Sequence, residues 1–159
     1  MASEAGLERT LHRLEAICQR RGQRLTRQRR AVVAKLLAAG RTLSAYELLD
    51  LLRPEDGKST PASVYRSLDF LMELGLVHRL ETTRSFIVCE HPDEPHPVQF
   101  LICRQCGLVV EAEDKRVATA TEKLGHQLGF VLDHRIVELT GLCGSCQTKH
   151  PGRDSRLAA

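Results

Sequence analysis

Residues 89–111 read CEHPDEPHPVQFLICRQCGLVVE, and this stretch decides the fold. It holds three of the six cysteines and two of the seven histidines. Its later part, CRQCG at 103–107, is a knuckle in which two thiols can face one cation while the glycine takes the positive φ of a tight turn. A second knuckle, CGSC at 143–146, follows after 36 residues. Two such pairs without a secretory signal predict a closed tetrahedral zinc site, with a pair of redox motifs as the alternative.

The same stretch marks a boundary between two domains. Residues 90–97 contain three prolines and two histidines, a composition that excludes regular structure and predicts a hinge. The first 80 residues carry a net charge of +5 and the remainder −2. A basic front half indicates a domain that faces a polyanion. The expected divisions are a first domain at 1–89, a hinge at 90–97, a second domain at 98–148 and a polar tail at 149–159.

Ahead of the stretch, capping residues and apolar spacing predict four helices. An amphipathic helix covers about 7–20, and its apolar stripe includes Cys18 as a buried thiol. The next three begin after Thr26, Ser44 and Thr60, residues that cap helices well. The expected ends are Gly40 for the second helix, Pro54 for the third and Gly75 for the fourth.

Two short apolar runs, 76–80 and 85–89, then predict a β-hairpin. Helices followed by a hairpin make a winged helix-turn-helix, whose last helix enters the major groove of DNA. After the hinge we expect a strand from Val98, a return strand at 108–111, a helix at 115–128 and a strand at 130–140. The fold class is therefore α+β. A second domain this small buries little apolar surface and needs zinc and a partner subunit.

Several classes of protein are excluded by what the sequence lacks. No apolar run approaches the roughly 20 residues of a membrane span. The polar, acidic start resembles neither a signal nor a transit peptide, so we expect a cytoplasmic protein with reduced thiols. An open-coordination metal motif, a phosphate loop and a Ser/His/Asp arrangement are all missing. We expect neither an enzyme nor a small organic substrate.

Six motifs are spread along nearly the whole chain: RLTRQR at 24–29, SAYELLDLL at 44–52, PASVYR at 61–66, LMELGLVH at 71–78, CRQCG at 103–107 and GLCGSC at 141–146. Through these motifs the sequence resembles the ferric uptake regulator family, and within it the zinc uptake branch. The resemblance implies a homodimeric, metal-dependent DNA-binding repressor with an N-terminal winged helix and a C-terminal dimerisation domain. Ser63 stands where the family usually has threonine, which keeps the hydroxyl.

We expect two zinc ions per chain. The structural site takes Cys103, Cys106, Cys143 and Cys146. The resemblance to the zinc branch implies a regulatory site of His78, Cys89, His96 and Glu111. A soft thiolate together with imidazole and one carboxylate suits tetrahedral zinc better than octahedral iron or manganese. Individually, His78 could be an ordinary residue of the wing, Cys89 a buried strand thiol and Glu111 a solvated acid.

Other histidines compete for metal. His91 lies two residues from Cys89, and His96 is preferred because its spacing of seven residues to Cys103 matches the family pattern. Some relatives have a third metal site at the position of His134. Its usual companions are hard to identify here and His134 lies in an alternating strand, so we expect His126 and His134 not to be ligands.

For DNA, Tyr65 and Arg66 are the candidates at the base edges, since arginine can bind guanine bidentately and tyrosine can pack on a thymine methyl. The alternative for Tyr65 is a structural role in which its ring covers the hydrophobic core. Ser63 lies in the same helix and is a further DNA-binding candidate. Arg29, Tyr46 and Arg84 are candidates for phosphate contacts. Asp50 and Arg53 could pair with each other, or, as the resemblance suggests, join adjacent dimers on one operator.

The sequence therefore predicts a zinc-responsive repressor in which zinc, as corepressor, fixes a dimer that binds a palindromic, AT-rich operator of zinc homeostasis genes. An iron or peroxide sensor of the same family is the first alternative, and Cys89 argues against it. A zinc-handling or thiol-redox protein is the second, and the capped helix before the wing argues against that.

Overall fold

The chain divides into two compact units, Met1–Pro95 and His96–Ala159. A computed structural model describes residues 4–93, 96–132 and 135–149. Both units contain helices and strands, which confirms the α+β class. The boundary between the units falls inside the predicted hinge at 90–97. Within the part of the chain that the structure describes, no helix is both long and apolar enough to cross a membrane.

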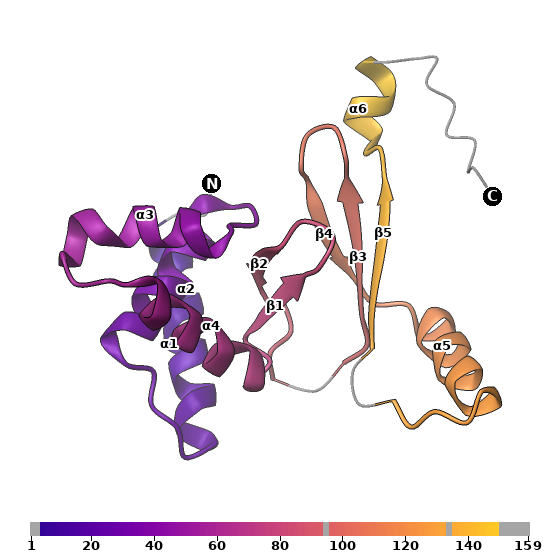
Figure 1. Cartoon of the computed structure of the whole chain (residues 1–159), viewed down its shortest axis with the longest axis horizontal. Helices are drawn as coiled ribbons and strands as arrows, with labels where there is room; N and C mark the ends of the chain where they lie inside the picture. The colour runs from indigo at the N-terminus through magenta and orange to yellow at the C-terminus, as the bar shows by residue number, and fades with distance from the viewer. Residues whose placement is uncertain (1–3, 94–95, 133–134, 150–159) are drawn as a thin grey trace. The chain divides into compact units, whose positions relative to one another are not determined.

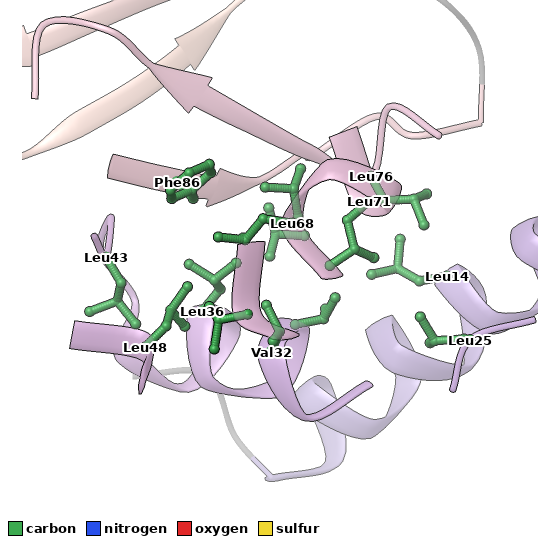
Figure 2. Close-up of a cluster of buried hydrophobic side chains, with 14 of the residues drawn as sticks. Leu14, Leu25, Val32, Leu36, Leu43, Leu48, Leu68, Leu71, Leu76 and Phe86 are labelled. Atoms are coloured by element: carbon green, nitrogen blue, oxygen red, sulfur yellow. The ribbon is translucent and has the colours of Figure 1, made fainter. Parts of the chain in front are cut away.

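The first unit packs four helices and a β-hairpin around one apolar core (Figure 1). Figure 2 shows leucine side chains from the helices meeting Phe86 of the hairpin. Cys18 is fully buried in this core, as predicted for a structural thiol. The elements are α1 (Glu4–Arg20), α2 (Arg27–Ala39), α3 (Ala45–Asp56), α4 (Pro61–Glu73), β1 (Val77–Leu80) and β2 (Ser85–Val88).

The predicted caps start α2, α3 and α4. The Thr26 hydroxyl accepts a hydrogen bond from the Arg29 N–H at the start of α2. At α3, the Glu47 N–H donates to Ser44 Oγ over 3.2 Å, and the Ser44 N–H donates to Glu47 Oε2 over 2.8 Å. Each pair satisfies backbone donors that a helix start leaves without a partner inside the helix.

The predicted end of α3 at Pro54 is wrong. Pro54 lies inside the last turn, and the helix continues to Asp56. A proline removes one backbone donor, a small loss so close to the helix end. The stop comes from Gly57, which has a left-handed φ of 60° and whose N–H donates to the Arg53 carbonyl over 2.9 Å.

The hairpin pairs β1 with β2 antiparallel, with Val77 opposite Val88 and Leu80 opposite Ser85. Leu43, in the segment before α3, joins its edge through two backbone hydrogen bonds with Phe86, of 3.1 and 2.8 Å. This contact attaches the hairpin to the helices, as in a winged helix. The turn between the strands holds Arg84 at a φ of 49°, a left-handed conformation that favours glycine or asparagine.

The residues after β2 are anchored to α1 by ion pairs. Arg13 Nε donates to Asp93 over 2.9 Å, and Arg20 Nη2 donates to the other carboxylate oxygen over 3.0 Å. The Arg13 hydrogen bond lowers the pKa of the Asp93 carboxyl. The chain therefore stays attached to the first unit for several residues beyond the wing.

The second unit is built on a three-stranded sheet in the order β4-β3-β5. β3 runs antiparallel to β4 and parallel to β5, and α5 lies on the crossover between β4 and β5. Phe100 in the central strand is fully buried. The elements are β3 (Val98–Cys103), β4 (Val109–Ala112), α5 (Lys115–Gln127), β5 (Ile136–Gly141) and α6 (Gly144–Lys149).

The last strand begins six residues later than the sequence predicted. The segment after α5 forms a helix stop: the Phe130 N–H donates to the Gly125 carbonyl over 2.9 Å, and Gly129 has a φ of 76°. Leu132 then folds back so closely that a Cβ on Gly125 would lie 2.7 Å from Leu132 Cδ1. The residues directly after α5 therefore terminate that helix and do not belong to a strand. The strand β5 starts at Ile136.

One face of this sheet is apolar and exposed. Leu101 in β3 pairs with Val110 in β4 and with Leu139 in β5, so the three side chains form a row across the strands. Their exposed fractions are 47%, 47% and 51%. A groove of about 490 Å³ runs over this row. Exposed apolar area of this kind marks an interaction surface.

Candidate metal centres and nucleic-acid interface

Parallel pairing brings the two cysteine knuckles together. β3 ends at Cys103, whose register partner in β5 is Gly141. The two knuckles therefore follow their strands at the same end of the sheet. In the first knuckle, Gly107 has a φ of 73° and its N–H donates to the Cys103 carbonyl over 2.9 Å. In the second, the N–H of Cys146 donates to the Cys143 carbonyl over 2.9 Å.

The four sulfur atoms have the spacing that zinc requires. One ligand atom from each of Cys103, Cys106, Cys143 and Cys146 lies within 4.8 Å of every other. Cys106 Sγ and Cys143 Sγ are 3.7 Å apart. Zn–S bonds of about 2.3 Å in a tetrahedron place sulfur atoms roughly 3.8 Å apart. The donor set therefore fits a zinc ion bound by four thiolates.

Electrostatics at this cluster favours a bound cation. The N–H groups of Cys143 and Cys106 lower the pKa of Cys103 to about 6, because they stabilise its thiolate. Burial and the neighbouring thiols raise the pKa of Cys146. Four adjacent thiols do not all ionise readily, because their negative thiolates repel one another. A bound divalent cation offsets that repulsion.

The first unit supplies one imidazole and one thiol. His78 lies in β1, and Cys89 directly follows β2. The Cys89 N–H donates to the Leu76 carbonyl over 3.0 Å, which extends the ladder of the hairpin by one residue. The nearest ligand atoms of His78 and Cys89 lie within 4.8 Å, and Cys89 is 4% exposed.

The second unit supplies an imidazole and a carboxylate. His96 Nε2 lies 3.0 Å from Glu111 Oε1 in β4, and both side chains are largely buried. Glu113 Oε1 is 3.7 Å from the same nitrogen. Glu113 was not among the residues predicted from the sequence, although its spacing of two residues from Glu111 is the period that puts strand residues on one face.

These two pairs are the four predicted regulatory ligands, and their sharing of one ion stays a prediction. His91 is exposed, and it does not belong to either metal-ligand group found among the described residues. His134 lies outside the described residues, so the expectation that it is not a metal ligand stays a prediction.

On the first unit, the DNA candidates on α4 face solvent. Tyr65 is 45% exposed, which does not support the alternative that it covers the core, and Arg66 is exposed beside it. Tyr46 on α3 is 69% exposed, and Arg84 is exposed in the turn of the hairpin. Asp50 and Arg53 are also exposed on α3.

Two other DNA candidates make contacts inside the unit. The guanidinium carbon of Arg29 lies 3.3 Å from the centre of the Phe70 ring, and Arg29 Nη1 donates to the Arg24 carbonyl over 2.9 Å. Ser63 Oγ accepts a hydrogen bond from Gln28 Nε2 over 2.6 Å. Contacts of Arg29 and Ser63 with DNA stay predictions.

Comparison with known proteins gives one consistent family. A sequence model of the ferric uptake regulator family matches residues 20–140. The zinc uptake regulation protein of Escherichia coli (strain K12) is 41% identical over 137 residues, which are 86% of this chain and 80% of the relative.

Two solved structures resemble most of the chain. A zinc uptake regulator complexed with zinc and DNA has a TM-score of 0.87 and 38% identity, over 91% of this chain and 97% of that one. The crystal structure of holo XcZur has a TM-score of 0.80 and 42% identity, over 87% of this chain and 96% of that one.

Proposed function

The chain belongs to the ferric uptake regulator family, and on that premise we propose that it is a zinc-responsive transcriptional repressor with zinc as corepressor. The observation that carries the proposal is the donor chemistry: a four-thiol cluster in the second unit, and a thiol among the four predicted regulatory ligands. Sulfur and imidazole ligands suit zinc, whereas iron and manganese sites favour oxygen-rich, six-coordinate sets. The similarity to a zinc uptake regulator in complex with zinc and DNA supports the same assignment.

The first zinc ion is structural and is held by Cys103, Cys106, Cys143 and Cys146. Four thiolates complete the tetrahedron, so no position stays open to a substrate or water. The ion joins the ends of β3 and β5 and stabilises a unit whose own core is small. Consistent with a family of transcription regulators, we assign the chain no enzymatic activity.

The second zinc ion is regulatory and takes His78, Cys89, His96 and Glu111. His96 is preferred over His91 because its ring nitrogen lies 3.0 Å from Glu111, while His91 is exposed. Two of these ligands come from each unit, so one shared ion restricts the angle between the units. That restriction shifts the population toward the DNA-binding form of the dimer. A coupling of ~1–3 kcal/mol changes operator affinity roughly 5–150-fold.

The partners are operator DNA and a second copy of the chain, in the cytoplasm. The recognition helix α4 offers Tyr65 and Arg66 to a palindromic, AT-rich operator. The homodimer forms on the second unit, where Leu101 belongs to an exposed apolar row suited to self-association. Two dimers meet on one operator through the exposed Asp50 and Arg53.

The replacement Cys89→Ser tests the proposal. We expect the variant to keep one zinc ion per chain and its dimer, and to lose zinc-dependent DNA binding. The measurements are zinc content after dialysis and DNA affinity with and without a chelator. His91→Ala is the control and should behave like the parent. Parent-like zinc content and DNA binding in Cys89→Ser would rule out the regulatory site.

A further inference from the structure

The start of the recognition helix α4 is held by a chain of polar contacts centred on Ser63. Its hydroxyl accepts hydrogen bonds from the Thr60 N–H over 3.0 Å and from Gln28 Nε2 over 2.6 Å, and donates to the Thr60 carbonyl over 2.9 Å. A serine hydroxyl has one proton and two lone pairs. These three hydrogen bonds therefore use its full capacity inside the protein.

Apolar packing holds α4 from Val64 onward, because Val64, Leu68 and Leu71 are all fully buried in the core of the first unit. Near the first turn, by contrast, a cavity of about 400 Å³ opens among α2, α3 and α4, with Gln28 and Ser63 in its lining. The Gln28–Ser63 hydrogen bond is a direct side-chain link from α2 to this turn.

We propose that Gln28 is a positioning residue for sequence recognition: through Ser63 it fixes the first turn of α4, and with it the direction of Tyr65 and Arg66. On this reading Ser63 is the anchor of the recognition helix and not itself a DNA contact. The inference rests on the proposed DNA-binding function. The inference adds a residue of α2, Gln28, whose side chain affects the DNA sequence preference without contacting a base.

If the first turn of α4 is no longer held in place, the protein should bind its operator less selectively. Its non-specific, electrostatic binding to DNA phosphates should change little. Specific binding requires Arg66 at one place and angle, whereas non-specific binding depends on charge alone. Loss of one hydrogen bond should lower operator affinity about three- to tenfold. Binding to unrelated DNA should change less than about twofold, because no charge has been removed.

The experiment is a double-mutant cycle on Gln28→Ala and Ser63→Ala in the zinc-loaded full-length dimer. The probes are a duplex selected from a random pool by the parent protein and a scrambled duplex of the same composition. If Gln28 acts through Ser63, the double variant binds no more weakly than Ser63→Ala alone. Ser63→Thr, which keeps the hydroxyl, should restore the selected-to-scrambled affinity ratio. Gln23→Ala, an exposed glutamine before α2, is the matched control.

The outcomes separate this inference from the proposed function. If the parent selects no duplex, the repressor proposal fails. If the parent binds selectively and Gln28→Ala binds equally well, the positioning role is wrong. Equal losses on both duplexes, or additive losses in the double variant, would also overturn it, since they indicate a direct contact or general destabilisation. Gln28→Asn, whose shorter side chain cannot span the gap, repeats the test should Gln28→Ala fold poorly.

Discussion

Tyr65 and Arg66 follow Ser63 closely on α4, yet the three side chains have different surroundings. The Ser63 hydroxyl is fully used by neighbours, whereas Tyr65 and Arg66 are exposed. Arg29 is also a basic residue of this unit, and its head group stacks on Phe70. A charge or hydroxyl in the right motif therefore says little about its contacts until its neighbours are known.

Arg66→Ala should weaken binding to the selected operator and relax the preference at one base pair in each half-site. A bidentate arginine–guanine pair contributes about 1–3 kcal/mol of discrimination. Competition binding against every single-base variant of the operator measures both effects. Arg9→Ala, which removes an exposed charge from α1, is the control. A uniform loss across all operator variants would assign Arg66 to phosphate instead.

At the scale of the element, short-range chemistry accounts for most of what could be predicted. The starts of α2, α3 and α4 were predictable because a capping residue acts within three positions of itself. The knuckles were predictable because their spacing is local. The parallel pairing of β3 with β5, the short helix α6 and the Gln28–Ser63 bond were not, since each depends on contacts distant in sequence or on a helix too short to show a period.

The capping box of α3 should make stability depend on pH. The Ser44 N–H stabilises the Glu47 carboxylate and lowers its pKa below the ordinary value of 4.5. A lowered pKa stabilises the fold above the unfolded-state pKa, and the gain is lost as pH falls through the folded-state value.

Glu47→Gln keeps the capping geometry and removes the charge. We expect it to lower the urea midpoint at pH 7, and the difference from the parent to shrink below about pH 4. Glu73→Gln, an exposed glutamate of α4, is the charge-matched control. A difference that is the same at both pH values would mean that the carboxylate charge plays no part in the cap.

For the whole molecule, the apolar row of the second unit predicts how the chain assembles. Leu101 lies at the centre of that row, between Val110 and Leu139. Leu101→Glu should convert the proposed dimer to a monomer, because a carboxylate buried without a partner in an apolar interface is strongly unfavourable. Sedimentation equilibrium measures the mass, and zinc content reports whether the four-cysteine cluster survives.

Leu51→Glu, at an exposed position of α3, adds the same charge to the first unit and should leave the mass unchanged. A dimer that persists in Leu101→Glu would place the interface elsewhere. Loss of both zinc and mass would mean that the replacement unfolds the unit, and the dimer would then be tested with Leu139→Glu.

The union of the two knuckles at the ends of parallel strands has a consequence for the nascent chain. The second knuckle is separated from the first by 36 residues, which a ribosome adds in roughly two to seven seconds. During that interval the first knuckle has two thiols without their partners, and β3 has an edge that β5 has yet to cover. Oxidants can react with the two thiols, and strands of other chains can pair with the open edge of β3. Zinc scarcity would extend this vulnerable interval, so metal supply would govern how much of the newly made protein reaches its folded state.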